Sequence, residues 1–265
     1  MKTFVVSGSA SGIGAATTEV LRSQGDRVIT VDLRDAEVTA DLSTPAGRNH
    51  AVTQVQRLTD VVHGLVPCAG LAGATGVDSA LVVSVNFFGA VALARGLQPQ
   101  LASAGGASVV LLASNSITGM PGWRVSVADL CLADDEPAAR ADAVRAESVM
   151  VYPATKAALA WWARREGTTE PWIGHGIRLN AVAPGMIDSP MTDQLLADPE
   201  IGPLLEAYPT AIGRVGRPEE VAALIAFMLS DACSLMVGSV VYADGGTDAI
   251  LHPESPQGWA VQRGE

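Results

Sequence analysis

Short runs of apolar, largely β-branched residues alternate along the chain with longer segments in which apolar residues recur at helical spacing. Because these runs are short and almost continuously apolar, they are typical of strands that are buried on both faces of a sheet. The predicted strands are Thr3 to Ser7, Arg27 to Asp32, Val61 to Cys68, Ser108 to Ser114, Ile177 to Gly185 and Ser239 to Gly246.

Amphipathic segments of helical length separate most of these strands, at Ala15 to Ser23, Pro45 to Leu58, Val77 to Leu97 and Pro218 to Leu229. Strands joined by crossover helices form a parallel sheet that is covered on both faces. The pattern therefore predicts an α/β fold, a doubly wound (Rossmann) parallel sheet. No repeat or linker divides the chain, so we expect one domain over residues 1–265.

Two connections depart from this rhythm. After VDLR, too few residues precede EVTADLS for a crossover helix, so a loop and a short strand are predicted there. Between Ser114 and Tyr152 the chain is longer than one crossover needs, with helical patches at Val125 to Leu132 and Pro137 to Glu147. We expect residues 118–148 to form an inserted helical flap before the helix that carries Tyr152. The flap is expected to have an apolar face, with Val125, Leu130 and Leu132, and a solvated face, with Arg140, Asp142, Arg145 and Glu147.

The acidic run Asp134, Asp135 and Glu136 lies inside this flap, just before Pro137. Carboxylates favour the first turn of a helix, where proline is also tolerated. A hard cation needs about six oxygen ligands. We therefore interpret the run as a helix start, and no metal site is predicted.

Composition excludes several classes of function. The formal net charge of -11 is unfavourable for binding nucleic acids or anionic membrane surfaces. The three cysteines are far apart and in no metal-ligand spacing, which indicates a reducing, cytoplasmic location. Glycines interrupt the N-terminal apolar run before a signal-peptide core, and no stretch is expected to span a bilayer.

A glycine-rich loop, SGSASGIG, follows the first predicted strand and contains Gly8, Gly12 and Gly14. Glycines there permit a tight turn and let backbone N–H groups approach a pyrophosphate at the N-terminus of the next helix. Asp32 ends the second strand, where its carboxylate can bind an adenosine ribose and repel a 2′-phosphate. This favours NAD over NADP, although the nearby Arg34 leaves the alternative open, as does a plain turn-forming role for Asp32.

Tyr152 and Lys156 are four residues apart in an otherwise apolar segment, so they lie on the same face of a helix. A tyrosine ordinarily titrates near pH 10, but an ammonium about 4 Å away favours the phenolate by about 4 kcal/mol at an effective dielectric of about 20. The pair can therefore act as a proton acceptor. A buried tyrosine beside a lysine that extends to the surface is the alternative. Pro153 predicts that the helix begins at about Tyr152.

Several motifs together resemble the short-chain dehydrogenases/reductases over nearly the whole chain. They are SGSASGIG, Asp32, CAG at Cys68 to Gly70, SVNFFG around Asn86, the serine after SVVLLA, YPATK, LNAVAPG and DGG at Asp244 to Gly246. The short loop, the long flap and the tail DGGTDAILHP are similar to the bacterial hydroxysteroid dehydrogenases/carbonyl reductases of that family. Its coniferyl-alcohol dehydrogenases are similar in the same respects.

The resemblance implies four catalytic residues. Tyr152 would be the general base in alcohol oxidation and the acid in carbonyl reduction. Lys156 would lower the pKa of Tyr152 and hydrogen-bond the nicotinamide ribose. Ser114 would orient the substrate oxygen, and Asn86 would hold a water in a proton relay to Lys156. Ser116 also has a serine spacing seen in the family, but Ser114 directly follows the apolar run and is preferred.

The resemblance also implies a set of cofactor-binding residues. Asp41 and Leu42 would flank the adenine, and Ile187 and Ser189 would meet the nicotinamide carboxamide. Ser7, Cys68 and Ser189 stand where the family usually has threonine, asparagine and threonine, and each keeps approximate size or hydrogen-bonding capacity. The full set is Gly8, Ser9, Ala10, Ser11, Gly12, Ile13, Gly14, Asp32, Asp41, Leu42, Cys68, Ala69, Gly70, Tyr152, Lys156, Ile187 and Ser189.

We therefore expect an NAD-dependent oxidoreductase that interconverts a secondary alcohol and a ketone on a bulky apolar molecule. The flap and the substrate-loop region, residues 186–212, would wall the pocket. A 3α-hydroxysteroid is the first choice of substrate, with coniferyl-type aromatic or terpenoid alcohols as the alternative. A distant alternative is a dinucleotide sensor without turnover. We also expect a homo-oligomer, preferably a dimer that meets through the last helix and the C-terminal strand.

Overall fold

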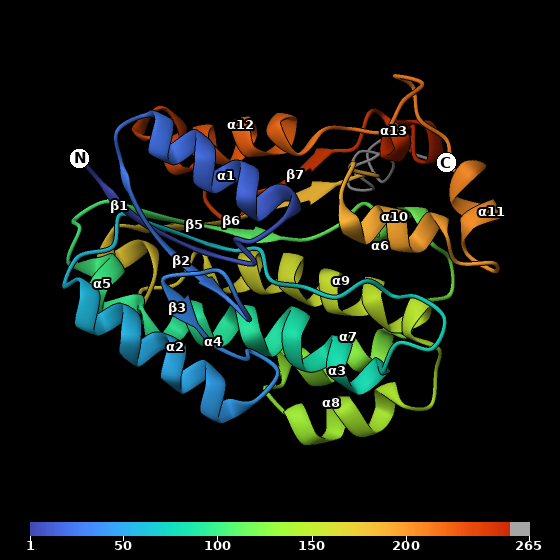
Figure 1. Ribbon diagram of the computed structural model, residues 1–265, viewed down its shortest axis with the longest axis horizontal. Helices are drawn as coiled ribbons and strands as arrows, with labels where there is room; N and C mark the ends of the chain where they lie inside the picture. The colour runs from blue at the N-terminus through green and yellow to red at the C-terminus, as the bar shows by residue number, and fades with distance from the viewer. Residues whose placement is uncertain (255–265) are drawn as a thin grey trace, which may run out of the picture.

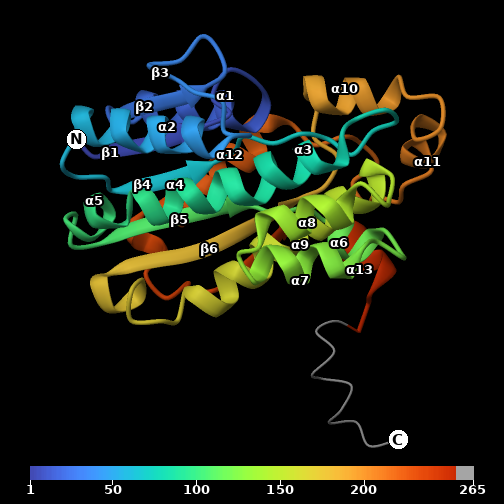
Figure 2. The same cartoon turned by 90° about the horizontal axis from the view of Figure 1, so that it is seen from below.

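The computed structural model describes residues 1–254, and its centre is a seven-stranded parallel sheet. The strand order is β3-β2-β1-β4-β5-β6-β7, with most of the strands visible side by side in Figure 2. The strands are β1 (Thr3–Ser7), β2 (Arg27–Asp32), β3 (Val38–Thr39), β4 (Gly64–Pro67), β5 (Ala107–Leu112), β6 (Ile177–Pro184) and β7 (Val240–Ala243). The predicted doubly wound parallel sheet is confirmed; residues 255–265 of the predicted domain lie outside the described residues.

The local predictions near the N-terminus are also confirmed. β1 and β2 have the predicted bounds, and the connection after β2 leads through a loop to the two-residue strand β3. β4 and β5 end before the predicted Cys68 and Ser114, so both residues lie in the loops that leave the sheet.

Alternate residues of the strands enter two different cores. Phe4 and Val6 pack in a cluster with residues of α1 (Gly12–Ser23) and α12 (Pro218–Leu229). Val5 packs in the cluster on the other face, which α2 (Pro45–Leu58), α4 (Ala90–Gly96) and α9 (Ser148–Glu166) cover. Figure 1 shows these two helical layers above and below the sheet. This alternation explains why the strands are apolar along their whole length.

The predicted helix Val77 to Leu97 contains a turn that the sequence did not indicate. It consists of α3 (Ser79–Val83), a π-helical turn (Ser84–Gly89) and α4. By length and composition the segment Ser79–Gly96 could cross a membrane, which corrects the expectation that no stretch would qualify. However, 72% of it is buried inside the protein, as in the core helix of a globular domain.

The inserted flap contains α7 (Val125–Leu132) and α8 (Glu136–Ala143), which follow the short α6 (Ser116–Gly119). α7 packs against α9, and α8 packs against α3. The predicted apolar face was wrong in part, because Val125 is 50% exposed while Val127 and Ala128 are buried. The predicted solvated face was also wrong in part: Asp142 accepts hydrogen bonds from Arg124 and Ser126.

The acidic run forms the start of α8, as predicted. The Asp135 side chain accepts a hydrogen bond from the N–H of Ala138, and Glu136 is the first helical residue. Asp134 forms an ion pair with Arg95.

The predicted start of the helix at Tyr152 was wrong. α9 begins at Ser148, so Pro153 lies inside the helix. Ser148 is buried and donates a hydrogen bond to the carbonyl of Ala74, which fixes the first turn against the loop after β4. Tertiary contacts of this kind override the local preference of proline for a first turn.

The remaining helices are short. The connections contain α5 (Gln98–Ala102) and the 3-10 turns Ile173–His175 and Asp231–Cys233. α10 (Pro190–Leu196) and α11 (Gly202–Glu206) follow β6, and α13 (Thr247–Leu251) follows β7. Figure 1 shows α10, α11 and α13 together at the right-hand end, where the parallel strands of the sheet finish. Ligands of open parallel sheets bind at this edge.

Candidate active site

A cavity of about 550 Å³ opens where β1, β2, β4, β5 and β6 end. It contains most of the predicted site residues: Gly8, Ser11, Gly12, Ile13, Gly14, Asp32, Asp41, Leu42, Cys68, Ala69, Gly70, Ser114, Tyr152, Lys156, Ile187 and Ser189. Residues as far apart in the sequence as Gly8 and Ser189 thus share one cavity. Ser9, Ala10 and Asn86 are the predicted residues that do not line it.

The glycine loop is closely packed against the loop after β4. Gly8 has a φ of +65°, and a Cβ on it would lie 2.6 Å from the backbone nitrogen of Ala69. A Cβ on Gly14 would lie 2.1 Å from the carbonyl oxygen of Gly8. Neither position can accept a side chain without moving the backbone. The loop therefore brings backbone N–H groups and the N-terminus of α1 to the cavity, as an anion site requires.

Asp32 lies at the end of β2 and fixes the same loop. Its carboxylate accepts hydrogen bonds from the N–H groups of Ala10 (3.0 Å) and Leu33 (2.7 Å). A carboxylate has about four acceptor positions, so the side chain can still accept bonds from a ribose. Arg34 is exposed and does not line the cavity. Ser9 and Ala10 belong to the loop but do not line the cavity, and the Ser9 hydroxyl donates to the carbonyl of Val31.

Tyr152 and Lys156 lie in the same cavity, and burial has the largest effect on the pKa of each. The Lys156 Nζ is 5.6 Å from the centre of the Tyr152 ring and donates to the carbonyl of Leu112 at 2.8 Å. Burial raises the pKa of the Tyr152 phenol above its ordinary value of 10.0, and the Ser114 hydroxyl lowers it in part. Burial also lowers the pKa of Lys156 from 10.5 to about 8. Desolvation therefore opposes the charged form of both Tyr152 and Lys156.

The structure distinguishes the two candidate serines. Ser114 lines the cavity, hydrogen-bonds the phenol of Tyr152 and accepts a bond from the N–H of Ser116 at 3.1 Å. The Ser116 Oγ is buried without a hydrogen-bond partner among the described residues. Ser114 is therefore the serine placed to meet an oxygen beside Tyr152.

Asn86 lies in the π-helical turn and is 1% exposed. Its amide exchanges hydrogen bonds with the backbone of Leu71, at 2.7 and 3.0 Å. A Cβ on Gly70 would lie 3.2 Å from the Asn86 Oδ1 and 3.7 Å from the Lys156 Nζ. Asn86 is therefore next to Lys156 but holds the loop after β4 rather than facing the cavity. π-Helical turns are common at functional sites, and this one positions the amide.

The sequence interpretation missed several cavity residues. They are Leu33, Ala40, Ser43, Leu71, Leu81, Val85, Leu112, Ala113, Pro184, Gly185, Pro190, Met191 and Thr192. Many are small or apolar and carry no chemical signal. Some were adjacent to a quoted motif, such as Leu71 after CAG and Val85 in SVNFFG. Position next to a motif was the available signal.

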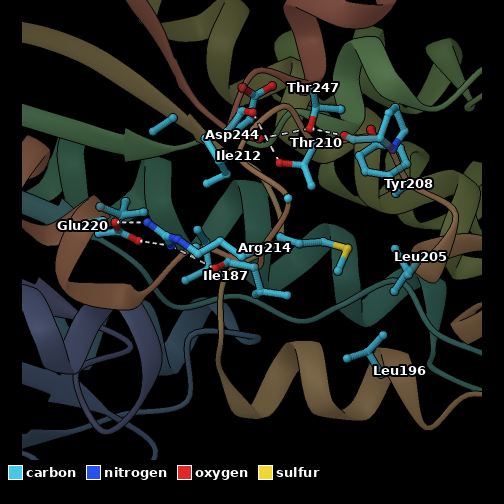
Figure 3. Close-up of a pocket in the computed structure, with 18 residues that line it drawn as sticks. Ile187, Leu196, Leu205, Tyr208, Thr210, Ile212, Arg214, Glu220, Asp244 and Thr247 are labelled. Carbon is cyan, nitrogen blue, oxygen red and sulfur yellow. Dashed lines mark hydrogen bonds and ion pairs between the residues drawn. The ribbon is translucent and has the colours of Figure 1, made fainter.

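A second cavity of about 520 Å³ lies under the segment after β6 and shares Ile187 with the first. In Figure 3, Leu196, Leu205 and Ile187 lie along one side, and Asp244, Thr210, Thr247 and Tyr208 gather along the other. Most of the lining belongs to the predicted substrate-loop region and the residues just after it. The flap helices α7 and α8 contribute no residue to either of these two cavities, and the expected flap wall of the pocket stays a prediction.

One contact joins the two segments that border the active-site cavity. The carboxylate of Asp198, which follows α10, accepts bonds from the N–H (2.8 Å) and the hydroxyl (3.0 Å) of Thr75. It also accepts bonds from the N–H groups of Glu200 and Ile201. Asp198 is only 8% exposed although Thr75 lies at the surface. The segment after β6 is thereby tied to the loop after β4.

Comparison with known proteins gives a consistent result. Residues 2–127 match the family model described as short chain dehydrogenase, and residues 139–248 match the model described as Enoyl-(Acyl carrier protein) reductase. The chain is 37% identical over 257 residues to a 3-alpha-hydroxysteroid dehydrogenase/carbonyl reductase of Comamonas testosteroni, covering 96% of this chain and 99% of that one. It is 31% identical to a coniferyl-alcohol dehydrogenase of a Pseudomonas species, covering 92% and 96%.

A solved structure is similar over the same length. The 3-alpha-hydroxysteroid dehydrogenase from Pseudomonas sp. B-0831, complexed with NADH, superimposes with a TM-score of 0.92. Its sequence identity is 39%, covering 96% of this chain and 100% of that chain.

Proposed function

Because the chain belongs to the short-chain dehydrogenase/reductase family, and is thus an oxidoreductase acting on CH–OH groups, we propose that it uses NAD to interconvert a secondary alcohol and a ketone on a bulky apolar molecule. The observation that carries this proposal is the single cavity that holds the glycine loop, Asp32, Ser114, Tyr152 and Lys156. A 3α-hydroxysteroid is the first substrate class to test.

The residues present fit a dinucleotide. The closely packed Gly8 and Gly14 leave the backbone of the loop free to approach a pyrophosphate at the start of α1. The Asp32 carboxylate would hold the adenosine ribose, and it would repel a 2′-phosphate. NAD, when bound, supplies the acceptor for the hydride that leaves the alcohol carbon.

Side chains of the protein would transfer the proton to and from the substrate oxygen. Ser114 would hold the substrate oxygen beside Tyr152, which takes the hydroxyl proton in oxidation and returns a proton to the carbonyl oxygen in reduction. Because the pKa of Tyr152 is raised above 10.0, the phenol carries its proton at neutral pH. The phenol would then already carry, at neutral pH, the proton that carbonyl reduction needs. Alcohol oxidation would require that this proton is first removed, so its rate should increase with pH.

The second cavity supports the substrate class. Its apolar lining residues include Met186, Leu196, Leu205 and Ile212, and its volume of about 520 Å³ is in the range of sites for drug-sized molecules. It meets the first cavity, which contains Ser114 and Tyr152, at Ile187. Steroids and aromatic alcohols both suit such walls, and the coniferyl-alcohol dehydrogenase relative makes aromatic alcohols the second candidate.

The test is a substrate screen that follows the absorbance of reduced nicotinamide, with NAD or NADP and with 3α-hydroxysteroids, coniferyl alcohol and cyclohexanols. We expect turnover of a polycyclic substrate with NAD, and loss of that turnover in Tyr152→Phe. Binding of NADH without turnover of any class would instead favour a sensor, the alternative that retention of Ser114, Tyr152 and Lys156 argues against.

Location and assembly complete the proposal. Cys68, Cys131 and Cys233 are unpaired, in keeping with a cytoplasmic protein.

On α12 and the segment before β7, Phe227 is 48% exposed and Leu235 is 97% exposed. The flap covers part of α3 and α9, so a homodimer would use the α12 and β7 surface. Phe227→Glu should therefore give monomers when the mass is measured by light scattering.

A further inference from the structure

Arg48, on α2, is an almost buried cation that is not one of the predicted catalytic residues. Its side chain is 6% exposed. The Nε donates to the carbonyl of Leu42 at 2.8 Å, and Nη2 donates to the carbonyls of Ser43 (3.1 Å) and Ser84 (3.3 Å). Arg48 therefore joins the loop after β3 to the start of the π-helical turn.

These two segments form one end of the active-site cavity. Ala40 to Ser43 line it on one side, and Leu81 and Val85 line it on the other. They are in close contact behind the cavity, since a Cβ on Gly89 would lie 3.3 Å from the Cβ of Leu42. Asp32 lies at this end of the cavity, where the adenosine half of a dinucleotide would bind. Arg48 lies behind this wall and does not line the cavity itself.

The counter-charge of Arg48 comes from the flap. Glu136, the first residue of α8, accepts bonds from Nη1 at 2.7 Å and from Nη2 at 2.5 Å, and its side chain is 17% exposed. Bidentate pairs of this kind fix both distance and orientation. Without Glu136 the guanidinium would be a buried charge with no counter-charge in this group of contacts, which is strongly unfavourable.

A second contact of the same helix reinforces the first. Arg140 of α8 donates to the carbonyl of Ala80 at 3.1 Å and to the hydroxyl of Ser84. The flap thus holds Ser84 directly through Arg140 and indirectly through Glu136 and Arg48. Ser84 begins the π-helical turn that also contains Asn86 and Val85.

We propose that Glu136 and Arg48 are positioning residues through which the flap sets the width of the adenosine end of the cofactor cavity, and hence the affinity for NAD. This inference depends on the proposed NAD-dependent function. It assigns the flap a role at the cofactor rather than at the substrate entrance. Neither residue touches the reacting atoms, so the rate of the saturated enzyme should not depend on the pair.

The test compares Glu136→Gln with a matched control, Asp142→Asn. The new amide places a donor against a guanidinium that also only donates, so the bidentate pair is lost. Asp142 forms an equivalent pair with Arg124 in the same flap, at 2.8 and 2.6 Å, and neither residue lines a cavity. Both changes remove one negative charge from the flap and keep the side-chain size.

Dissociation constants for NADH and for ADP-ribose are measured by fluorescence titration and calorimetry, with kcat and the substrate KM at saturating NAD. We expect Glu136→Gln to weaken both ligands by about tenfold, the loss expected for one charge-assisted pair. ADP-ribose lacks the nicotinamide, so an equal effect on it localises the change to the adenosine half. The kcat and KM should remain within about twofold of wild type, and Asp142→Asn should leave both affinities unchanged.

Unchanged affinities in Glu136→Gln would overturn the inference, and so would equal weakening in Asp142→Asn, which would indicate general damage to the flap. Where Glu136→Gln folds poorly, the double variant Arg48→Met/Glu136→Met removes both charges together. We expect this double variant to fold. It should bind ADP-ribose more weakly than the wild type, because no guanidinium then donates to the carbonyls of Leu42, Ser43 and Ser84. Wild-type affinity in that variant would also overturn the inference. If the wild type bound neither NADH nor ADP-ribose, the proposed cofactor itself would be wrong.

Discussion

The charged side chain of Lys156 should lower the free energy of unfolding at neutral pH, although the activity of the protein depends on this residue. The side chain is 5% exposed, and its ammonium donates to the carbonyl of Leu112. Burial lowers its pKa from 10.5 to about 8. At about 1.4 kcal/mol for each pKa unit, this fall corresponds to about 3 kcal/mol of folding free energy lost in the charged state.

Replacing Lys156 with methionine keeps the long apolar stem and removes the charge. The carbonyl of Leu112 loses a hydrogen bond, which costs about 1 kcal/mol. The Lys156→Met variant should therefore be more stable than the wild type by about 2 kcal/mol at pH 7, while its turnover is lost.

The sign of the pH dependence follows from the direction of the pKa shift. Below pH 8 the folded wild type holds a charged Lys156, and the destabilisation is complete. Between about 8 and 10.5 the unfolded chain binds more protons than the folded one, so the wild type gains stability as the pH rises. Above 10.5 the advantage of the variant should have disappeared or reversed.

Urea unfolding followed by tryptophan fluorescence, without cofactor, measures both proteins at pH 7 and at pH 10.5. The pKa itself can be measured directly, because Lys2 is the only other lysine in the chain. In Lys2→Arg with labelled lysine, a single side-chain NMR signal should titrate near pH 8. A variant less stable than the wild type at pH 7, or a stability difference that does not change with pH, would refute the reasoning.

Four further outcomes are expected. Tyr152→Phe should bind NADH within about twofold of wild type but lose at least about 100-fold in kcat, because only the proton-transfer group is removed; turnover within tenfold of wild type would contradict its role. Alcohol oxidation should increase between pH 7 and pH 10 since the pKa of Tyr152 lies above 10.0, and a flat pH profile in stopped-flow measurements would contradict the raised pKa. Asp32→Ala should reduce the preference for NAD over NADP by about tenfold in kcat/KM, and equal use of both cofactors by the wild type would show that Asp32 does not discriminate. Asp198→Asn should make the segment after β6 more sensitive to limited proteolysis and lower kcat/KM for bulky substrates, because the Thr75 contact is weakened, whereas identical cleavage rates would show that the contact does not hold the segment.

The sequence was sufficient wherever a feature depends on near neighbours in the chain. β1 and β2 have the predicted bounds because continuous apolar runs and the glycines after them are local signals. α2 begins at Pro45, where Thr44 and proline mark a helix start. The four-residue spacing of Tyr152 and Lys156 is by itself enough to place them on one helix face.

The position of the flap could not be read from its own residues. Its polar and apolar pattern predicted helices correctly but assigned Val125 to a buried face and Asp142 to a solvated one. Which face is buried depends on α3 and α9, the partners against which the flap packs. For the same reason, the pattern did not indicate that α8 packs against α3 and α7 against α9.

Tertiary structure also decided the electrostatics of the site. The spacing of Tyr152 and Lys156 determined that they are neighbours, but burial of both groups, with the Ser114 hydroxyl beside the phenol, determines the directions of their pKa shifts. The pair of Arg48 and Glu136 joins residues 88 positions apart, and no local pattern connects them. Secondary structure and helix-face spacing follow from local sterics and periodicity, whereas desolvation and long-range ion pairs depend on which surfaces the complete fold brings together.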